Sequence, residues 1–341
     1  MNQVLLKKIN SLFNIPTLSY KGKAKGGFLS DNYILTNITD KYFLKKYRNP
    51  VGNRLPIISE TEEFFANQDV PIILPIKTKT GKSYFEINKE YYSLYPFVKA
   101  RGFDHKKDKL TPTMAKSIAS NLALMHKLSE RGKSKLSKER IKEWDPKIVL
   151  SKDAQTDFRK YVDKVSEAIN KKRTKTNFDK LTLDILKLKT SIAESFPRNI
   201  KIGRLGRNHV LHGDYHAQNL FFNKNDQVTH IFDLEKTETR PRSTELVRSM
   251  FIICFNSYFT AKNFKLARTY LKAYKEIYPI KNSEIESSIR FMFYKHTLNL
   301  WIEKGHYLNN YKRADILLAG ELRFTKYLSK NLETLVKRLL H

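Results

Sequence analysis

The spacing of hydrophobic residues divides the chain into a strand-rich first part and a helix-rich second part. β-prone runs lie at residues 30–36, 41–45, 72–77, 84–87 and 91–97. Residues 59–68 carry acids early, turn Phe64 and Phe65 to one side and end before Pro71, which predicts one short helix. The residues between the first two runs suit a hairpin connection. We therefore expect a small antiparallel sheet that carries one helix.

From Thr111 onward, apolar residues recur at steps of three and four, the spacing of one face of a helix. Two such stripes comprise Met114, Ile118, Leu122, Met125 and Leu128, and Leu181, Ile185, Leu188 and Ile192. Both are predicted to face a core. Short runs at 209–211 and 228–232 predict two strands that interrupt the helices, and residues 243–341 return to helix.

Length and composition bound the architecture. A chain of 341 residues exceeds the size at which one hydrophobic core stops growing, so we expect two lobes. Hydrophobic residues make up 40% of the chain, which excludes a disordered or collagen-like protein. The single cysteine, Cys254, can form no internal disulfide and lies in an apolar run where packing explains it. With no apolar run long enough to span a membrane, we expect a cytoplasmic protein.

The chain is strongly basic, with 64 Lys and Arg against 34 Asp and Glu and a formal charge of +30. Such a balance is found in proteins that bind nucleic acid or anionic membranes. The surplus is spread over the whole length and consists mainly of Lys, whereas base and phosphate recognition favours Arg. A solvated surface is therefore favoured over a nucleic acid partner.

The candidate chemistry lies beside the two later strands. Asp214 and Asn219 stand five residues apart in a loop after one strand, and Asp233 directly ends the next. Carboxylate and amide oxygens at a common edge suit Mg²⁺, which is usually held by one or two carboxylates together with substrate phosphates. Asp214 is the predicted base that receives or orients an acceptor proton, and Asn219 and Asp233 are the predicted metal ligands of a phosphoryl transfer.

A zinc site is the alternative for the same segment, because His212 and His216 are four residues apart. Gly213 after a strand indicates a loop rather than a helix, and no Cys or third His lies nearby in the sequence. We expect His212 to orient the loop and His216 to face the acceptor or solvent.

The segment from His212-Gly213-Asp214 to Asn219, followed by Asp233, resembles the catalytic loop and metal-binding segment of the aminoglycoside phosphotransferase and choline kinase-like superfamily. Protein kinases carry Arg at the place of Gly213, which favours the small-molecule branch. The resemblance implies an α+β, bilobal protein kinase-like fold. Residues 1–98 would form a nucleotide-binding lobe with a small antiparallel sheet and one helix. Residues 99–341 would form a larger, mostly helical lobe with the catalytic loop, metal site and acceptor-binding helices.

The resemblance also implies that Lys45 contacts the α and β phosphates of ATP and is held by a carboxylate of the following helix. Glu60 is the predicted carboxylate and Glu63 the alternative. Backbone N–H groups near Gly27 and Ser30 would meet phosphate oxygens. The competing interpretations are that Lys45 only guards an edge strand and that Glu60 only stabilises its helix terminus.

A Tyr-Pro-Phe sequence at residues 95–97 is similar to the connection between the lobes in this superfamily. It implies adenine recognition by the carbonyl of Pro96 and the N–H of Val98. Because Pro96 would only accept a hydrogen bond, its lack of an N–H group does not weaken this recognition. Glu235 resembles an acidic position that assists a second metal, or it pairs with a neighbouring Arg.

Three later aromatic residues, Tyr294, Trp301 and Tyr307, are core residues by their helical spacing, with an acceptor pocket as the alternative.

These inferences predict an ATP- and Mg²⁺-dependent phosphotransferase acting on a hydroxyl of a small molecule: an amino sugar, amino alcohol, sugar or hydroxy amino acid. The alternative is a catalytically weak kinase-fold protein that binds RNA or an anionic surface through its basic exterior. The acceptor and the oligomeric state are left open by the sequence.

Overall fold

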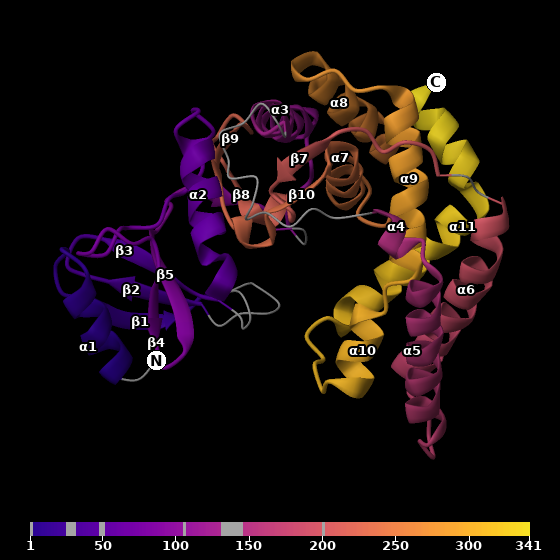
Figure 1. Ribbon diagram of the computed structural model, residues 1–341, viewed down its shortest axis with the longest axis horizontal. Coiled ribbons are helices and arrows are strands. Elements are labelled where there is room, and N and C mark those ends of the chain that lie inside the picture. The colour runs from indigo at the N-terminus through magenta and orange to yellow at the C-terminus, as the bar shows by residue number, and fades with distance from the viewer. Residues whose placement is uncertain (1–2, 25–31, 48–51, 105–106, 131–145, 200–201) are drawn as a thin grey trace. The chain divides into compact units, whose positions relative to one another are not determined.

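The computed structural model of the protein describes residues 3–24, 32–47, 52–104, 107–130, 146–199 and 202–341 (Figure 1). Contacts between residues divide the chain into two units. Described residues of 1–107 join those of 212–237 in the first unit, and most of the remaining residues form the second. The first unit thus extends beyond the predicted boundary at residue 98 and includes a segment from far along the chain.

The first unit is built on a five-stranded antiparallel sheet in the order β1-β2-β3-β5-β4. Its elements are α1 (Gln3–Leu12), β1 (Ser19–Lys23), β2 (Tyr33–Thr36), β3 (Lys41–Lys46), α2 (Leu55–Ala66), β4 (Phe85–Ile87) and β5 (Glu90–Pro96). Leu35, Leu44 and Leu94 of the central strands are fully buried in one cluster with Ile9 of α1. The alternation of buried and exposed residues along β2 and β3 forms this one-sided core.

The predicted hairpin and small sheet are confirmed, with three differences. The helix begins at Leu55 rather than at residue 59, because Pro56 lies in its first turn, where a missing N–H costs nothing. Helix α1 and strand β1 were not predicted. Residues 72–77 are irregular: Ile72 makes only an isolated bridge to Ile231, and Ile73 N donates to the Ile231 carbonyl at 2.9 Å.

A second, three-stranded sheet brings the segment His212–Thr237 into the first unit. Its order is β6-β8-β9, formed by β6 (Arg101–Gly102), β8 (Leu220–Phe222) and β9 (Val228–Ile231). A 3₁₀ turn precedes β8 and another, Leu234–Lys236, follows β9. Ile231 N donates to the Pro71 carbonyl at 2.7 Å, so β9 is tied to the chain that leads into β4.

The second unit is mostly helical. Its helices are α3 (Pro112–Leu128), α4 (Pro146–Val149), α5 (Lys152–Asn170), α6 (Asn177–Asn199), α7 (Arg242–Met250), α8 (Ala261–Ile277), α9 (Asn282–Thr297), α10 (Trp301–Leu308) and α11 (Leu318–Leu340). Strands β7 (Asn208–Leu211) and β10 (Glu238–Pro241) pair antiparallel. A π-helical turn, Phe251–Phe255, follows α7. The predicted stripes are confirmed as core, since Ile118, Leu122 and Ile185 are fully buried.

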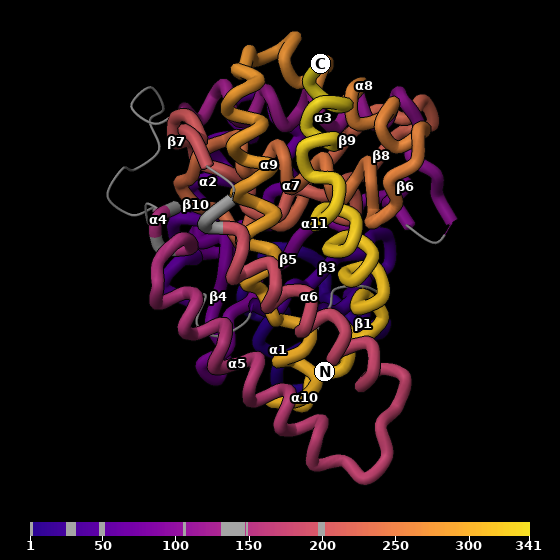
Figure 2. Tube along the Cα trace, turned by 90° about the vertical axis from the view of Figure 1, so that its right-hand side faces the viewer, coloured from indigo at the N-terminus to yellow at the C-terminus, as the bar shows by residue number. Residues whose placement is uncertain are grey.

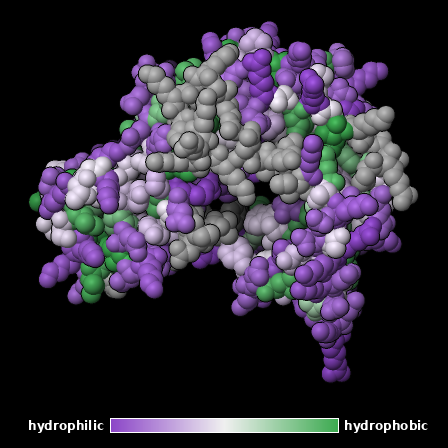
Figure 3. All heavy atoms as spheres, viewed as in Figure 1, coloured by the Kyte–Doolittle hydropathy of each residue, from purple (hydrophilic) through white to green (hydrophobic). Residues whose placement is uncertain are grey.

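Helix α5 lies beside α6 in Figure 2, and its sequence is largely polar. It buries only a narrow stripe, Phe158, Val165 and Ile169, against Leu186 of α6. Hydrophilic side chains dominate the face seen in Figure 3, as expected for a dispersed positive charge. Cys254 is buried and free. In the part of the chain that the structure describes, no helix is long and apolar enough to cross a membrane.

Candidate active site

The first unit brings Lys45 together with two acids that follow it by almost two hundred residues. Lys45 lies on β3, and its Nζ is 2.6 Å from Oδ1 of Asp233 and 3.1 Å from Oε2 of Glu235. The lysine side chain is 3% exposed, whereas that of Asp233 is 31% exposed. A buried cation therefore meets a carboxylate that solvent and ligands can reach.

Apolar contacts hold the acidic end of this cluster in place. The ring of Phe232 packs edge-on against Phe43 at 5.4 Å and against Tyr95 at 4.9 Å between ring centroids. The next residue, Asp233, adopts a left-handed backbone with φ of 71° and begins the turn Leu234–Lys236. This conformation is uncommon for a residue with a side chain and turns the chain sharply after β9.

The charges of the cluster stabilise each other. Burial alone would lower the pKa of Lys45, but the nearby Asp233 and Glu235 raise it above its ordinary value. Burial would raise the pKa of Asp233, and the charge and hydrogen bond of Lys45 outweigh this and lower it. Both groups are therefore ionised at neutral pH. Glu235, for which a second-metal role and a pairing with Arg were predicted, pairs with Lys45.

Helix α2 places Glu62 within the electrostatic field of Lys45. Glu62 is buried and accepts a hydrogen bond from the Tyr95 hydroxyl at 3.1 Å. That hydroxyl is 3.0 Å from the hydroxyl of Tyr47, whose ring lies 4.8 Å from Lys45 Nζ. Burial raises the pKa of Glu62 to about 8, against the lowering effects of Lys45 and the Tyr95 hydrogen bond. Two tyrosines thus connect the helix acid to the lysine.

The two acids predicted for this role, Glu60 and Glu63, lie on the same helix, and a part for either in holding Lys45 stays a prediction. Glu63 pairs with Lys77, and Glu60 lies half-buried on the same helix. The apolar pattern of α2 does not fix its rotation to one residue, because a 3.6-residue period leaves adjacent positions only about 100° apart. The full burial of Phe65 and Ile58 on the same helix is the signal that orients Glu62 inward.

Asp214 lies in the loop after β7, as predicted, and its carboxylate lies close to Lys236 and His216. Lys236 Nζ donates to its Oδ2 at 2.8 Å, and His216 Nε2 lies 3.7 Å from its Oδ1. His212 is buried, and its Nε2 lies 3.0 Å from the carbonyl of Phe232, which suits the predicted role in orienting the loop. Lys236 was not predicted, because nothing in the sequence distinguishes it from other lysines.

Asn219 and Asp233 suit a hard cation. The amide nitrogen of Asn219 donates to the backbone carbonyl of Asp214 at 3.0 Å, which leaves the amide oxygen as the atom to coordinate. Asp233 uses Oδ1 for Lys45 and is partly exposed. Within the described ranges no group of three or more His, Cys, Asp or Glu side chains is arranged to hold a metal. Coordination of a cation by Asn219 and Asp233 stays a prediction.

A comparison with family models assigns residues 23–281 to APH, the phosphotransferase enzyme family. This chain belongs to that phosphotransferase family. No curated protein matches it in sequence. The structure is similar to that of a microcompartment-associated aminopropanol kinase, with a TM-score of 0.68 and 13% identity. The match covers 100% of this chain and 99% of that one. The predicted superfamily, the α+β kinase-like fold and the assignment as a phosphotransferase are confirmed.

Two further solved structures share the fold of this phosphotransferase. Spectinomycin phosphotransferase APH(9)-Ia, in complex with ADP and spectinomycin, has a TM-score of 0.65 and 16% identity, covering 99% of this chain and 97% of that one. Choline kinase from Cryptosporidium parvum has a TM-score of 0.60 and 12% identity, covering 98% of this chain and 99% of that one.

The remaining predicted nucleotide contacts lie at the end of β5 or outside the described residues. Pro96 is the exposed last residue of β5, and Val98 follows half-buried. Phe97 N donates to the Lys41 carbonyl at 3.1 Å, which fixes the backbone between them. Gly27 and Ser30 lie outside the described residues. Adenine recognition by Pro96 and Val98 stays a prediction.

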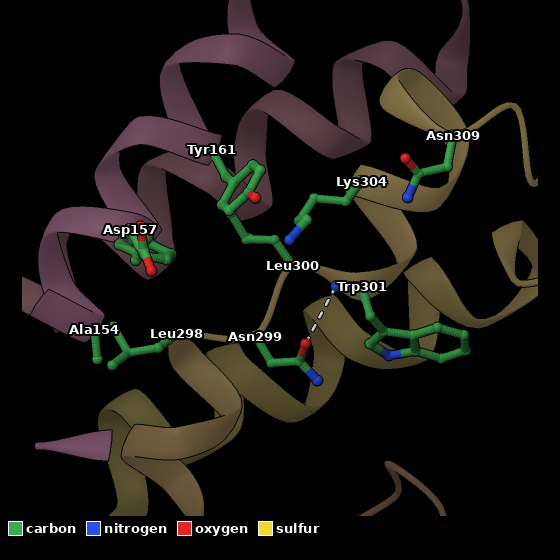
Figure 4. A pocket seen from close by; sticks show the side chains of 10 residues that line it. Ala154, Asp157, Tyr161, Leu298, Asn299, Leu300, Trp301, Lys304 and Asn309 are labelled. Atoms are coloured by element: carbon green, nitrogen blue, oxygen red, sulfur yellow. Dashed lines mark hydrogen bonds between the residues drawn. The ribbon is translucent and has the colours of Figure 1, made fainter. Parts of the chain in front are cut away.

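The second unit of the phosphotransferase contains an open cavity of about 390 Å³ between α5 and α10. Figure 4 shows Asp157 and Tyr161 projecting from α5, and Trp301 and Lys304 from α10. Lys304 Nζ lies 3.4 Å from the centroid of the Tyr161 ring. Of the three aromatics considered for an acceptor pocket, Trp301 lines this cavity, whereas Tyr294 is buried in the core. The lining combines aromatic faces with both signs of charge.

Proposed function

We propose that the protein is an ATP- and Mg²⁺-dependent phosphotransferase that phosphorylates a hydroxyl group of a small molecule, in the class of amino sugars, amino alcohols, sugars or hydroxy amino acids. The observation that carries this proposal is the 2.6 Å contact of Lys45 with Asp233, in one unit with Asp214 and Asn219. Family membership favours catalysis over the alternative of RNA or surface binding. Structural neighbours crystallised with ADP and spectinomycin, and with AMP-PNP, Ca²⁺ and amicoumacin, support nucleotide and cation use.

In the proposed reaction, the hydroxyl oxygen of the acceptor attacks the γ-phosphorus of ATP. A new oxygen–phosphorus bond forms while the bond to the β–γ bridging oxygen breaks, and its electron pair leaves with ADP. Asp214 orients the hydroxyl and takes its proton, which then passes to solvent. Lys45 contacts phosphate oxygens and remains positioned by Asp233 and Glu235. Asn219 and Asp233 would hold Mg²⁺, which when bound offsets phosphate charge and orients the triphosphate.

The test is ATP turnover against a broad panel of hydroxyl acceptors, comparing the wild type with Asp233→Ala. Loss of stabilisation at the phosphates should lower the rate by roughly three orders of magnitude or more. Thermal unfolding of both proteins verifies that the variant is folded. Equal turnover by the two proteins, or no turnover by the wild type with any acceptor, would contradict the proposal.

A mass-spectrometric screen of metabolite extracts with labelled ATP then identifies the acceptor. Addition of one phosphoryl group to a small amine-bearing or sugar-like compound is the expected product. A phosphorylated protein as the main product would contradict the proposed acceptor class.

A further inference from the structure

The contact between Lys236 and Asp214 is the feature of the site that the reaction described above leaves without a role. Lys236 Nζ lies 2.8 Å from Oδ2 of Asp214, and its side chain is 54% exposed. An exposed ion pair contributes only about 0–1 kcal/mol to stability, so folding gains little from it. The pair does place a mobile cation beside the carboxylate that takes the acceptor proton.

The backbone around Lys236 is built to keep it there. Gly213 has φ of 82°, and a Cβ at that position would lie 1.9 Å from the carbonyl oxygen of Lys236. Only glycine permits this close approach of the catalytic loop to the turn Leu234–Lys236. On the other side of the turn, the guanidinium of Arg54 donates to the carbonyl of Thr237. The main chain of Lys236 is therefore held on both sides, while its ammonium group is free to shift.

Resting on the proposed function, we infer that Lys236 is a further catalytic residue, whose ammonium group contacts the phosphoryl group in transfer. An acceptor hydroxyl bonded to Asp214 places its oxygen about 3–3.5 Å from the γ-phosphorus before attack. The ammonium group of Lys236, already next to Asp214, can reach an equatorial phosphoryl oxygen by a small rotation of its flexible stem. Charge spread over those oxygens in the transition state is what a cation stabilises.

This assignment gives Lys45 and Lys236 different roles. Lys45 is buried and bound by two acids, so its position is fixed before any substrate arrives. Lys236 has one acidic partner and solvent on its other sides. Lys45 contacts the phosphates that stay on ADP, and Lys236 contacts the one that leaves. A flexible point charge with three donors suits a group that changes position during the reaction.

The experiment measures binding of ADP and of a non-hydrolysable ATP analogue by calorimetry, in the full-length wild type and in Lys236→Met. A contact with the γ-phosphoryl should weaken binding of the triphosphate by about 10-fold and leave that of ADP unchanged. The kcat should fall by about 100-fold or more, with Lys236→Arg recovering part of it. Lys224→Met, which removes an exposed lysine of the same unit, should match the wild type.

Three outcomes would overturn the inference. Equal weakening of both nucleotides would assign Lys236 a structural role, and unchanged triphosphate binding and kcat would remove it from the reaction. If the wild type itself binds neither nucleotide, the proposed function fails together with this inference. In the first two cases the wild type still binds and turns over ATP, so the proposed function stands.

Discussion

Two clusters in this protein each contain one lysine with two carboxylates, but differ in what surrounds them; in the second, His296 also lies 3.0 Å from Glu321. Lys45 meets Asp233 and Glu235 in the first unit, and Lys189 meets Glu303 and Glu321 in the second. Both lysines are buried. Asp233 is 31% exposed, whereas Glu303 and Glu321 are 1% and 11% exposed, so the first cluster has the more accessible carboxylate.

The backbone also differs between the clusters. Lys189 Nζ donates to the carbonyl of Asn299 at 2.7 Å as well as to Glu321, so its donors are directed to groups of the protein. Lys45 has only acids and aromatic faces among its described contacts. A lysine with two acids is therefore not a catalytic site by itself. The exposure of one carboxylate, Asp233, distinguishes the cluster around Lys45 from the cluster around Lys189.

The largest effect on stability is expected for Lys189→Met. Burial alone would lower the pKa of Lys189, and Glu321 and Glu303 raise it, so the charge is retained in the core. Removing it leaves buried carboxylates uncompensated, and the free energy of unfolding should fall by about 3–5 kcal/mol. Urea denaturation measures this, with Lys187→Met, an exposed lysine of the same helix, as control. An unchanged stability would mean that the second cluster carries no net structural energy.

The variant Lys45→Met should lose catalytic activity rather than stability. We expect kcat/KM to fall by about 100- to 1000-fold, equivalent to roughly 3–4 kcal/mol, while stability changes by less than about 2 kcal/mol because Asp233 can be solvated. Steady-state kinetics and urea denaturation of the same preparations separate the two quantities. Lys46→Met, which breaks only a pair with Glu90, is the neighbouring control. A stability loss as large as that of Lys189→Met would show that the two clusters contribute equally to the free energy of unfolding.

A smaller effect concerns the buried acid behind the first cluster. Between its ordinary pKa of 4.5 and about 8, Glu62 holds a proton in the folded state that the unfolded state has lost. The folded state then binds more protons, so stability falls as pH rises through this window, by about 2 kcal/mol between about pH 6 and 8. Glu62→Gln should flatten that slope and Glu63→Gln should leave it. Parallel slopes in wild type and Glu62→Gln would contradict a raised pKa.

The smallest effect is expected for Lys77→Met. Its pair with Glu63 is about half exposed, and such pairs contribute less than about 1 kcal/mol. Chemical denaturation at low and high salt should give nearly the same stability for this variant and the wild type. A loss above that limit would mean that exposure does not rank the ion pairs of this protein.

The sequence predicted which candidate residues lie in one unit better than it predicted their neighbours. Asp214, Asn219 and Asp233 follow strands whose apolar runs are unambiguous, and the structure places all three in one unit. Glu62 was missed because one-residue differences in helix rotation are below the resolution of an apolar pattern. The contact of Lys236 with Asp214 was not predicted because it depends on the close approach of Gly213 to the Lys236 backbone, which a local pattern does not show.

Elsewhere, prediction failed where tertiary contacts decide the local structure. Helix α5 has a polar sequence and is held by a narrow apolar stripe against α6. Residues 72–77 have the composition of a strand, yet Ile73 N donates to Ile231 while Ile76 N donates to Leu94 of the main sheet, so the run is not a strand of either sheet. The partner of α5 is the next helix, whereas Ile231 is far along the chain from residues 72–77, and the pattern within either segment contains no information about these contacts.

The hydrogen bonds that join Ile231 to Pro71 and Ile73 also bear on how the protein is made. During translation, the first 107 residues leave the ribosome while the segment that completes their unit is still unsynthesised. About a hundred residues of the helical unit emerge in between. Until then the backbone groups of Pro71 and Ile73 lack these partners, so this is the stage of synthesis at which a chaperone would protect the first unit most.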